Sequence, residues 1–226
     1  MLTTLRNLTL VTATAVSLLT VACDDPAKGK AKAVTSEAVT SASASLGAPA
    51  AAPTGASATY AFDQATSKIT WVGSKVPGKH DGGFSTFKGT VDVNDGLPEK
   101  SKVDVEIDAN SLTSDQEKLT GHLKSPDFFD TAGHPKATFS STKIEKGGAN
   151  GASHTVTGNL TIKGNSKSIT FPANVKVEGD QASVDAEFAI NRRDFDLNYA
   201  GKPNDLIRDD VVIKLAIKAT KQPKKS

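Results

Sequence analysis

The stretch Lys102-Val103-Asp104-Val105-Glu106-Ile107-Asp108-Ala109 alternates charged and apolar residues without interruption. Successive side chains of a β-strand point to opposite faces, so this period of two predicts a strand with one buried face and one face in water. The same alternation recurs at residues 156–162, 169–177, 184–190 and 211–217. The chain is therefore expected to be mainly antiparallel β-sheet.

Short turn sequences separate several of these stretches. Asn94-Asp95-Gly96, Lys163-Gly164-Asn165 and Glu178-Gly179-Asp180 combine Gly with Asn or Asp, residues that tolerate the positive φ angles of tight hairpin turns. Consecutive hairpins form a meander, and closing a meander into a barrel removes its exposed edges. We predict an up-and-down antiparallel β-barrel of about eight strands.

One segment between the strands has helical character. Ser114 followed by Glu117 forms a capping-box pattern, Leu119 and Leu123 share a face at i, i+4, and Ser125-Pro126 ends the pattern. The prediction is a single short helical segment that covers the mouth of the barrel as a lid.

The inward positions of the predicted strands include small residues, namely Ala109, Gly158, Ala173 and Ala186. Two interpretations remain open from the residues alone. Either these positions leave space for a small ligand, or they only accommodate strand coiling around an interior filled with side chains.

Positive and negative charges nearly balance over the 226 residues, with 27 Lys and Arg against 25 Asp and Glu. Such a chain carries no strong field to attract nucleic acid, so nucleic-acid binding is not expected. The single Cys excludes an internal disulfide, a CxxC redox pair and a cysteine-built zinc site.

No catalytic or metal motif stands out. There is no HExxH arrangement and no Gly-x-Ser-x-Gly elbow. We therefore expect no metal, no cofactor and no enzymatic activity; the rival hypothesis is an enzyme that uses His80 and His122 as acid and base. Arg192 and Asp194 alternate onto one strand face, where Arg192 either pairs with Asp194 or holds the headgroup of a ligand.

The N-terminus has the pattern of an export signal. Leu8 to Ala22 is an uncharged run of about the length of a signal h-region, so residues 1–22 are predicted to be a signal peptide. The following Leu19-Thr20-Val21-Ala22-Cys23 resembles the lipobox of bacterial lipoproteins, which implies that Cys23 is acylated. The alternative is an ordinary signal peptidase site near Ala22 with a leftover Cys.

Residues 23–58 contain no aromatic residue and are rich in Ala, Ser, Thr and Pro. Such a segment buries too little apolar surface to offset its conformational entropy, so we predict a flexible tether after Cys23. The globular domain is expected to comprise residues 59–226.

Several motifs of this domain resemble those of one family. They are Ile69-Thr70-Trp71-Val72-Gly73-Ser74-Lys75, His122-Leu123-Lys124-Ser125-Pro126-Asp127-Phe128-Phe129-Asp130 and Ile190-Asn191-Arg192-Arg193-Asp194-Phe195, with Thr157-Gly158-Asn159-Leu160-Thr161-Ile162-Lys163-Gly164 between them. In this order and combination they resemble the YceI-like family.

The resemblance implies a lipocalin-like β-barrel, exported to the bacterial envelope, that encloses the tail of a polyisoprenoid or similar long-chain amphiphile. With Cys23 acylated, the protein would be a membrane-anchored lipoprotein facing the periplasm. The alternative is a non-catalytic envelope stress or interaction protein of the same fold with a filled barrel and no lipid ligand. The candidate ligand-binding residues are Trp71, Phe84, Phe87, Leu119, Leu123, Phe128, Phe129, Phe139, Phe171 and Phe188, with Arg192 at the headgroup.

Overall fold

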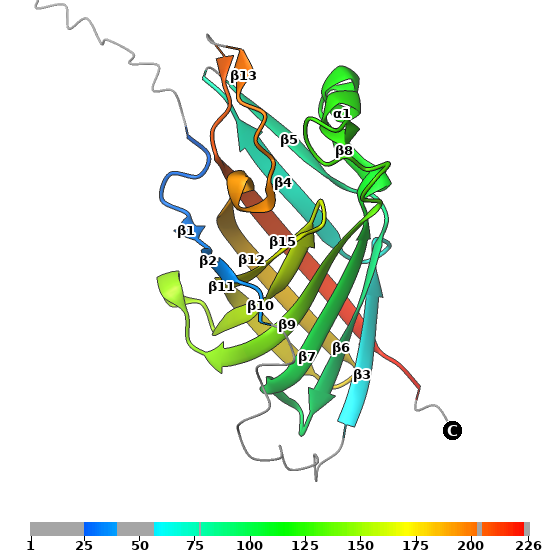
Figure 1. Ribbon diagram of the computed structural model, residues 1–226. Helices are drawn as coiled ribbons and strands as arrows, with labels where there is room; N and C mark the ends of the chain where they lie inside the picture. Colours follow the sequence, from blue (N-terminus) through cyan, green and yellow to red (C-terminus); the bar gives the residue numbers. More distant parts are fainter. Residues whose placement is uncertain (1–24, 40–56, 77, 203–204, 224–226) are drawn as a thin grey trace, which may run out of the picture.

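The computed structural model describes residues 25–39, 57–76, 78–202 and 205–223. These residues form a closed antiparallel β-barrel of eight strands with one α-helix at one end (Figure 1), which confirms the predicted fold. All five stretches with alternating residues are strands. They correspond to β7 (Leu97–Asp108), β10 (His154–Ile162), β11 (Asn165–Glu178), β12 (Gln181–Asn191) and β15 (Asp210–Lys221).

The first three strands of the barrel are each interrupted by a short break. Both β3 and β4 pair antiparallel with β15, so they form one long strand with a break between them. The second strand is β5 and β6, where β6 pairs with β3 and β5 pairs with β4. The third is β7 and β8, where β7 pairs with β6 and β8 pairs with β5. The bounds are β3 (Ser57–Asp63), β4 (Lys68–Ser74), β5 (Lys79–Phe84), β6 (Phe87–Asn94) and β8 (Leu112–Ser114).

The remaining strands complete a meander. β9 (Lys136–Lys146) pairs with β7 and β10, and the ring closes where β15 pairs with both β12 and the β3–β4 strand. The predicted turns join these strands. Asp95 and Gly96 have φ of 57° and 68°, and Lys163 and Gly164 have φ of 50° and 76°. Asp95 and the two Gly residues therefore occupy positions that require positive φ, and Lys163 adopts the same conformation.

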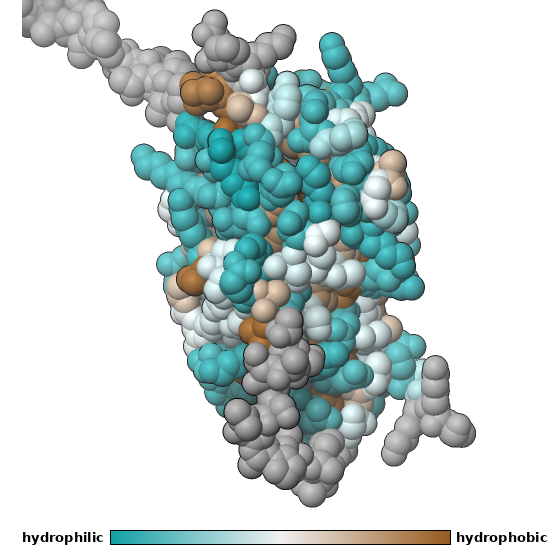
Figure 2. Space-filling view, in the orientation of Figure 1, coloured by the Kyte–Doolittle hydropathy of each residue, from teal (hydrophilic) through white to brown (hydrophobic). Residues whose placement is uncertain are grey.

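The core lies inside the barrel. Tyr60, Phe62, Ile169, Phe171 and Phe188 are among the buried residues of one large cluster that draws on nearly every strand. The outer face drawn in Figure 2 is mostly hydrophilic, as expected when every second residue of a strand points into water.

The predicted helix is present as α1 (Glu117–Lys124), next to β8 at one end of the barrel. The predicted capping box is wrong. Gln116 is the N-cap and its side chain makes no capping bond, while Ser114 ends β8 and its hydroxyl lies 2.8 Å from Thr120 Oγ1. Because Ser114 is committed to the sheet edge, it is not at the helix start.

Part of the predicted tether is an ordered element of the barrel. Asp25–Val39, here called the strap, contains β1 (Ala31–Lys32) and β2 (Val34–Glu37), which pair with β12 and β11. The prediction of a flexible spacer is therefore wrong for these residues, because their backbone pairs with strand edges and needs few apolar side chains. The predicted signal peptide (1–22), Cys23 and residues 40–56 lie outside the described residues.

The barrel begins at Ser57, two residues before the expected boundary. Several short elements complete the described chain. No helix in the described ranges is long and apolar enough to cross a bilayer. The short elements are η2 (Ala109–Ser111), η3 (Ala149–Gly151), η4 (Arg192–Phe195), β13 (Gly201–Lys202) and β14 (Asp205–Leu206).

Candidate ligand-binding cavity

The barrel encloses a cavity of about 260 Å³. Small-molecule pockets range over roughly 300–1,000 Å³, so this volume suits a slender ligand. Ala182 and Ile190 of β12 both line the cavity, and eight residues of strand span about 26 Å. The space is thus narrow and runs along the barrel.

The lining follows from the period of two along each strand. On β15, every second residue from Val211 to Ala219 lines the cavity, and on β7 the same holds from Ser101 to Ile107. The aliphatic members of these rows were not among the predicted site residues, although the alternation alone places them on the inner face. Those on β15 are Val211, Ile213, Leu215, Ile217 and Ala219.

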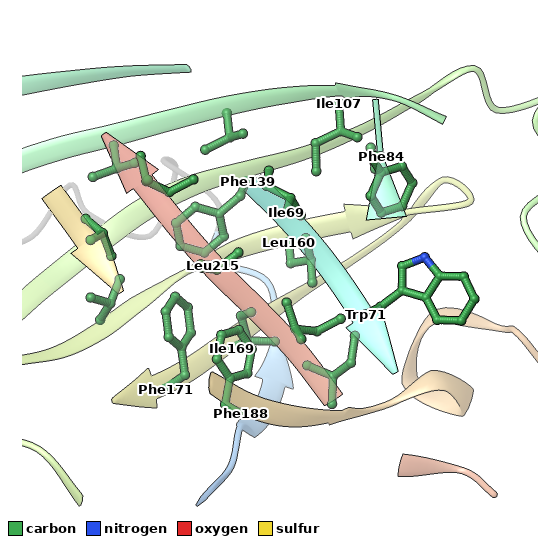
Figure 3. A pocket seen from close by; sticks show the side chains of 18 of the residues that line it. Ile69, Trp71, Phe84, Ile107, Phe139, Leu160, Ile169, Phe171, Phe188 and Leu215 are labelled. Carbon is green, nitrogen blue, oxygen red and sulfur yellow. The ribbon is translucent and has the colours of Figure 1, made fainter. Parts of the chain in front are cut away.

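Most of the predicted aromatic residues meet in this cavity. Figure 3 shows Trp71, Phe139, Phe171 and Phe188 extending from different strands into the same space. Phe87 is buried in the surrounding core, and Leu119 packs against a smaller buried cluster that contains Trp71 and Leu112. Neither Phe87 nor Leu119 is among the lining residues. The predicted residues that line it are Trp71, Phe84, Leu123, Phe128, Phe129, Phe139, Phe171, Phe188 and Arg192.

Glycines on the wall make room for the larger rings. A Cβ built on Gly82 would lie 2.1 Å from Trp71 Cζ2, and one on Gly158 would lie 2.4 Å from Phe139 Cζ. Of the two interpretations left open for the small inward residues, space for a ligand does not apply to Gly158, because the Phe139 ring occupies that space. The interior nevertheless is not filled, since the cavity remains.

The α1 end of the cavity is lined by a compact aromatic cluster. Trp71, Leu112, Leu123 and Phe128 form a buried group separate from the main core. The ring of Phe128 packs edge-on to His122 at 5.0 Å between centroids. This arrangement places the segment predicted as a lid at one end of the cavity.

Trp71 carries the polar group of most interest. Its side chain is 9% exposed, it lines the cavity, and its Nε1 has no hydrogen-bond partner among the described residues. A buried donor without a partner costs about 1–3 kcal/mol. The oxygen of a ligand would remove this cost.

Arg192 is buried, and its guanidinium is already satisfied. It pairs with Asp209 at 3.1 Å, donates from Nε to the Arg208 carbonyl at 3.1 Å, and donates from Nη1 to the Leu197 carbonyl. Burial lowers the pKa of Arg192, and the Asp209 charge opposes that effect. Of the two roles predicted for Arg192, the pair with Asp194 is wrong, because residues 192–195 form a 3-10 turn and not a strand.

Arg192 is the one charged residue among the described lining residues, so the cavity offers no free cation to an anionic headgroup.

Each His lies beside a different carboxylate, and in the described ranges no group of three His, Cys, Asp or Glu could hold a metal ion. These pairs are His80–Asp115, His122–Asp127, His134–Asp130 and His154–Glu99.

An eight-stranded up-and-down barrel around an elongated apolar cavity has a lipocalin-like architecture. The chain belongs to the YceI-like family, since the family model of the YceI-like domain matches residues 60–219. The strap precedes the matched residues.

Two relatives illustrate the sequence similarity. A UPF0312 protein of Pectobacterium atrosepticum is 31% identical over 147 residues, covering 62% of this chain and 73% of that protein. Protein YceI of Escherichia coli is 35% identical over 136 residues, covering 56% of this chain and 70% of that protein.

Solved structures share the barrel. BcnA of Burkholderia cenocepacia superposes with a TM-score of 0.59 at 29% identity, covering 70% of this chain and 99% of BcnA. A polyisoprenoid binding domain from Saccharophagus degradans, implicated in plant cell wall breakdown, superposes with a TM-score of 0.56 at 16% identity, covering 73% of this chain and 98% of that domain. The second likeness shows the fold alone.

Proposed function

We propose that this protein binds a polyisoprenoid or similar long-chain amphiphile and sequesters or transports it, with the tail inside the barrel. The observation that carries the proposal is the narrow cavity, lined along its length by aliphatic and aromatic side chains. The name of the structurally similar polyisoprenoid binding domain supports the same ligand class.

The energetics favour a long tail. Each buried methylene contributes about 0.8 kcal/mol, so about ten of them contribute about 8 kcal/mol. Association costs about 4–15 kcal/mol, which a short tail would not offset. The length of the cavity, from Ala182 to Ile190 along β12, accommodates more than a short tail.

The polar end of the ligand is proposed to lie near Trp71. Its unpartnered Nε1 donates to an oxygen of the ligand, whereas Arg192 is occupied by Asp209 and by carbonyl groups. The protein acts in this proposal as a non-catalytic carrier, because binding and shielding of the tail need no reacting group.

We also propose that the protein works in the bacterial envelope, facing the periplasm and anchored through acyl chains on Cys23. Two or three chains hold a protein firmly at a membrane, whereas one does not. Mass spectrometry of the mature N-terminus tests this: we expect an acylated Cys23, and an unmodified N-terminal residue other than Cys23 would contradict the anchor.

Lipid extraction from protein purified from its own host tests the ligand proposal. Leu215→Trp adds volume inside the cavity and is expected to reduce co-purified lipid at least fivefold, while Lys218→Trp on the outer face of the same strand retains it. Wild-type protein without any extracted lipid would favour the alternative, an envelope stress or interaction protein that carries no lipid.

A further inference from the structure

The wall of the barrel is split between β11 and β12. These strands pair only where Asn174–Glu178 meets Gln181–Asp185. Beyond that point β12 continues along β15 and β11 continues along β10, so the two strands diverge. The rings of Phe171 and Phe188 stack at 4.1 Å between centroids where the split begins.

The strap occupies this split. β1 pairs in parallel with Phe188 and Ala189, and β2 pairs antiparallel with Lys167–Thr170 (Figure 1). Neighbouring strands lie about 4.8 Å apart, so two strands that flank a third lie about 9.5 Å apart. The strap therefore completes the wall where β11 and β12 do not meet.

The split opens onto the ligand cavity. Ile169 and Phe171 on its β11 side and Phe188 and Ile190 on its β12 side all line that cavity. From the strap, Ala33 packs against the core, whereas the Val34 side chain is 69% exposed. The strap backbone and the stacked rings of Phe171 and Phe188 thus together separate the cavity from solvent at this place.

Few apolar contacts hold the strap. Ala27 is buried against Val72, Ala189 and Val212 on the outside of the barrel. Ala33 packs against the core, and the Val39 backbone exchanges two hydrogen bonds with the Asn159 side chain. The remaining side-chain contacts are ion pairs at the surface, which are individually weak and screened by salt. They are Asp25–Arg208 at 3.3 Å, Lys30–Glu187 at 2.7 Å, Lys32–Asp210 at 2.5 Å and Glu37–Lys167 at 2.6 Å.

We propose that the strap is a releasable part of the barrel wall, and that its release opens a lateral entrance to the cavity between β11 and β12. The inference rests on the proposed function, because it describes how a tail reaches the cavity. An apolar tail passes sideways through the split, and the strap then re-pairs and encloses it. The packed aromatic cluster at the α1 end remains in place throughout.

A disulfide across the strap tests this proposal. Glu37 and Lys167 are directly opposite each other in the β2–β11 ladder, so Glu37→Cys with Lys167→Cys in a Cys23→Ser background gives a geometry suited to a disulfide. The matched control is Lys88→Cys with Glu106→Cys, another opposed Lys–Glu pair, in the continuous β6–β7 wall. Trp71 is the only Trp and lines the cavity, so its fluorescence reports uptake of geranylgeraniol, a C20 isoprenoid alcohol.

We expect the oxidised strap variant to take up geranylgeraniol at least tenfold more slowly than the same protein after reduction, while the control changes less than twofold. Equal rates in the oxidised and reduced strap variant would overturn the lateral entrance but leave lipid binding intact. Absence of uptake in every form, wild type included, would overturn the proposed function and the entrance with it.

Hydrogen exchange of the wild-type chain provides a second test that needs no substitution. If the strap is released while the barrel stays folded, the amides of β2 exchange at least tenfold faster than those of β10. Equal protection of β2 and β10 would show that the strap opens only when the whole barrel unfolds, which would overturn the proposal.

Discussion

The strap and the η4 segment are two short pieces of chain that lie beside β11, and they are held by different forces. In η4, Phe195 is fully buried and Arg192 is 3% exposed and surrounded by carbonyl groups and Asp209. In the strap, Lys30 and its partner Glu187 are each 37% exposed. The difference indicates that η4 is part of the stable core, whereas the strap is bound at the surface.

Removal of the buried anchor of η4 should have the largest effect. Phe195→Ala is expected to lower the free energy of unfolding by about 3–5 kcal/mol, because it leaves a cavity in the core. Urea denaturation measures the change, and Arg193→Ala, at a half-exposed neighbour, is the control with a loss below about 1 kcal/mol. A loss for Phe195→Ala as small as that of the control would remove the contrast with the strap.

Replacing Arg192 should have an intermediate effect. Arg192→Met leaves the carbonyls of Arg208 and Leu197 without their donor and is expected to cost about 2–4 kcal/mol, while the folded protein still binds lipid. Thermal unfolding and lipid extraction together check this. Unchanged stability with lost lipid would instead show that Arg192 holds the headgroup.

The smallest expected effect concerns the strap. Hydrogen bonding from Lys30 holds the pKa of Glu187 below its usual value of 4.5, with Lys214 acting in the same direction. A carboxyl with a lowered pKa in the folded state stabilises at pH above that usual value, and the stabilisation is lost as pH falls through the folded-state pKa. Acidification below pH 4.5 should therefore loosen the strap.

Hydrogen exchange of β1 and β2, corrected for intrinsic rates, measures this loosening. Exposed ion pairs contribute about 0.2–1 kcal/mol each, so the change in protection should be no more than about tenfold. Glu187→Gln is the control: it should show faster exchange at neutral pH and a smaller response to acid. An identical acid response in that variant would assign the effect to other carboxylates.

Much of the barrel was predictable because strand alternation and turn chemistry are local properties. The row from Val211 to Ile217 identified both the strand and its inner face, and the same rule would have found Leu215 as a lining residue. The role of Gly158 was not predictable, since it depends on the ring of Phe139 from the neighbouring strand. Asp209, the partner of Arg192, is 17 positions from it and shares no sequence pattern with it.

The sequence by itself determined five of the strands, several turns, the short helix and the apolar inner face, because neighbouring residues along the chain carry that information. Only the tertiary structure decided that Asp25–Val39 completes the wall, because its pairing depends on edges that β11 and β12 leave open. Lys30 and Glu187, which meet in that arrangement, are 157 positions apart in the chain. No local pattern specifies such a contact, since backbone pairing requires only a free edge and an extended segment that can reach it.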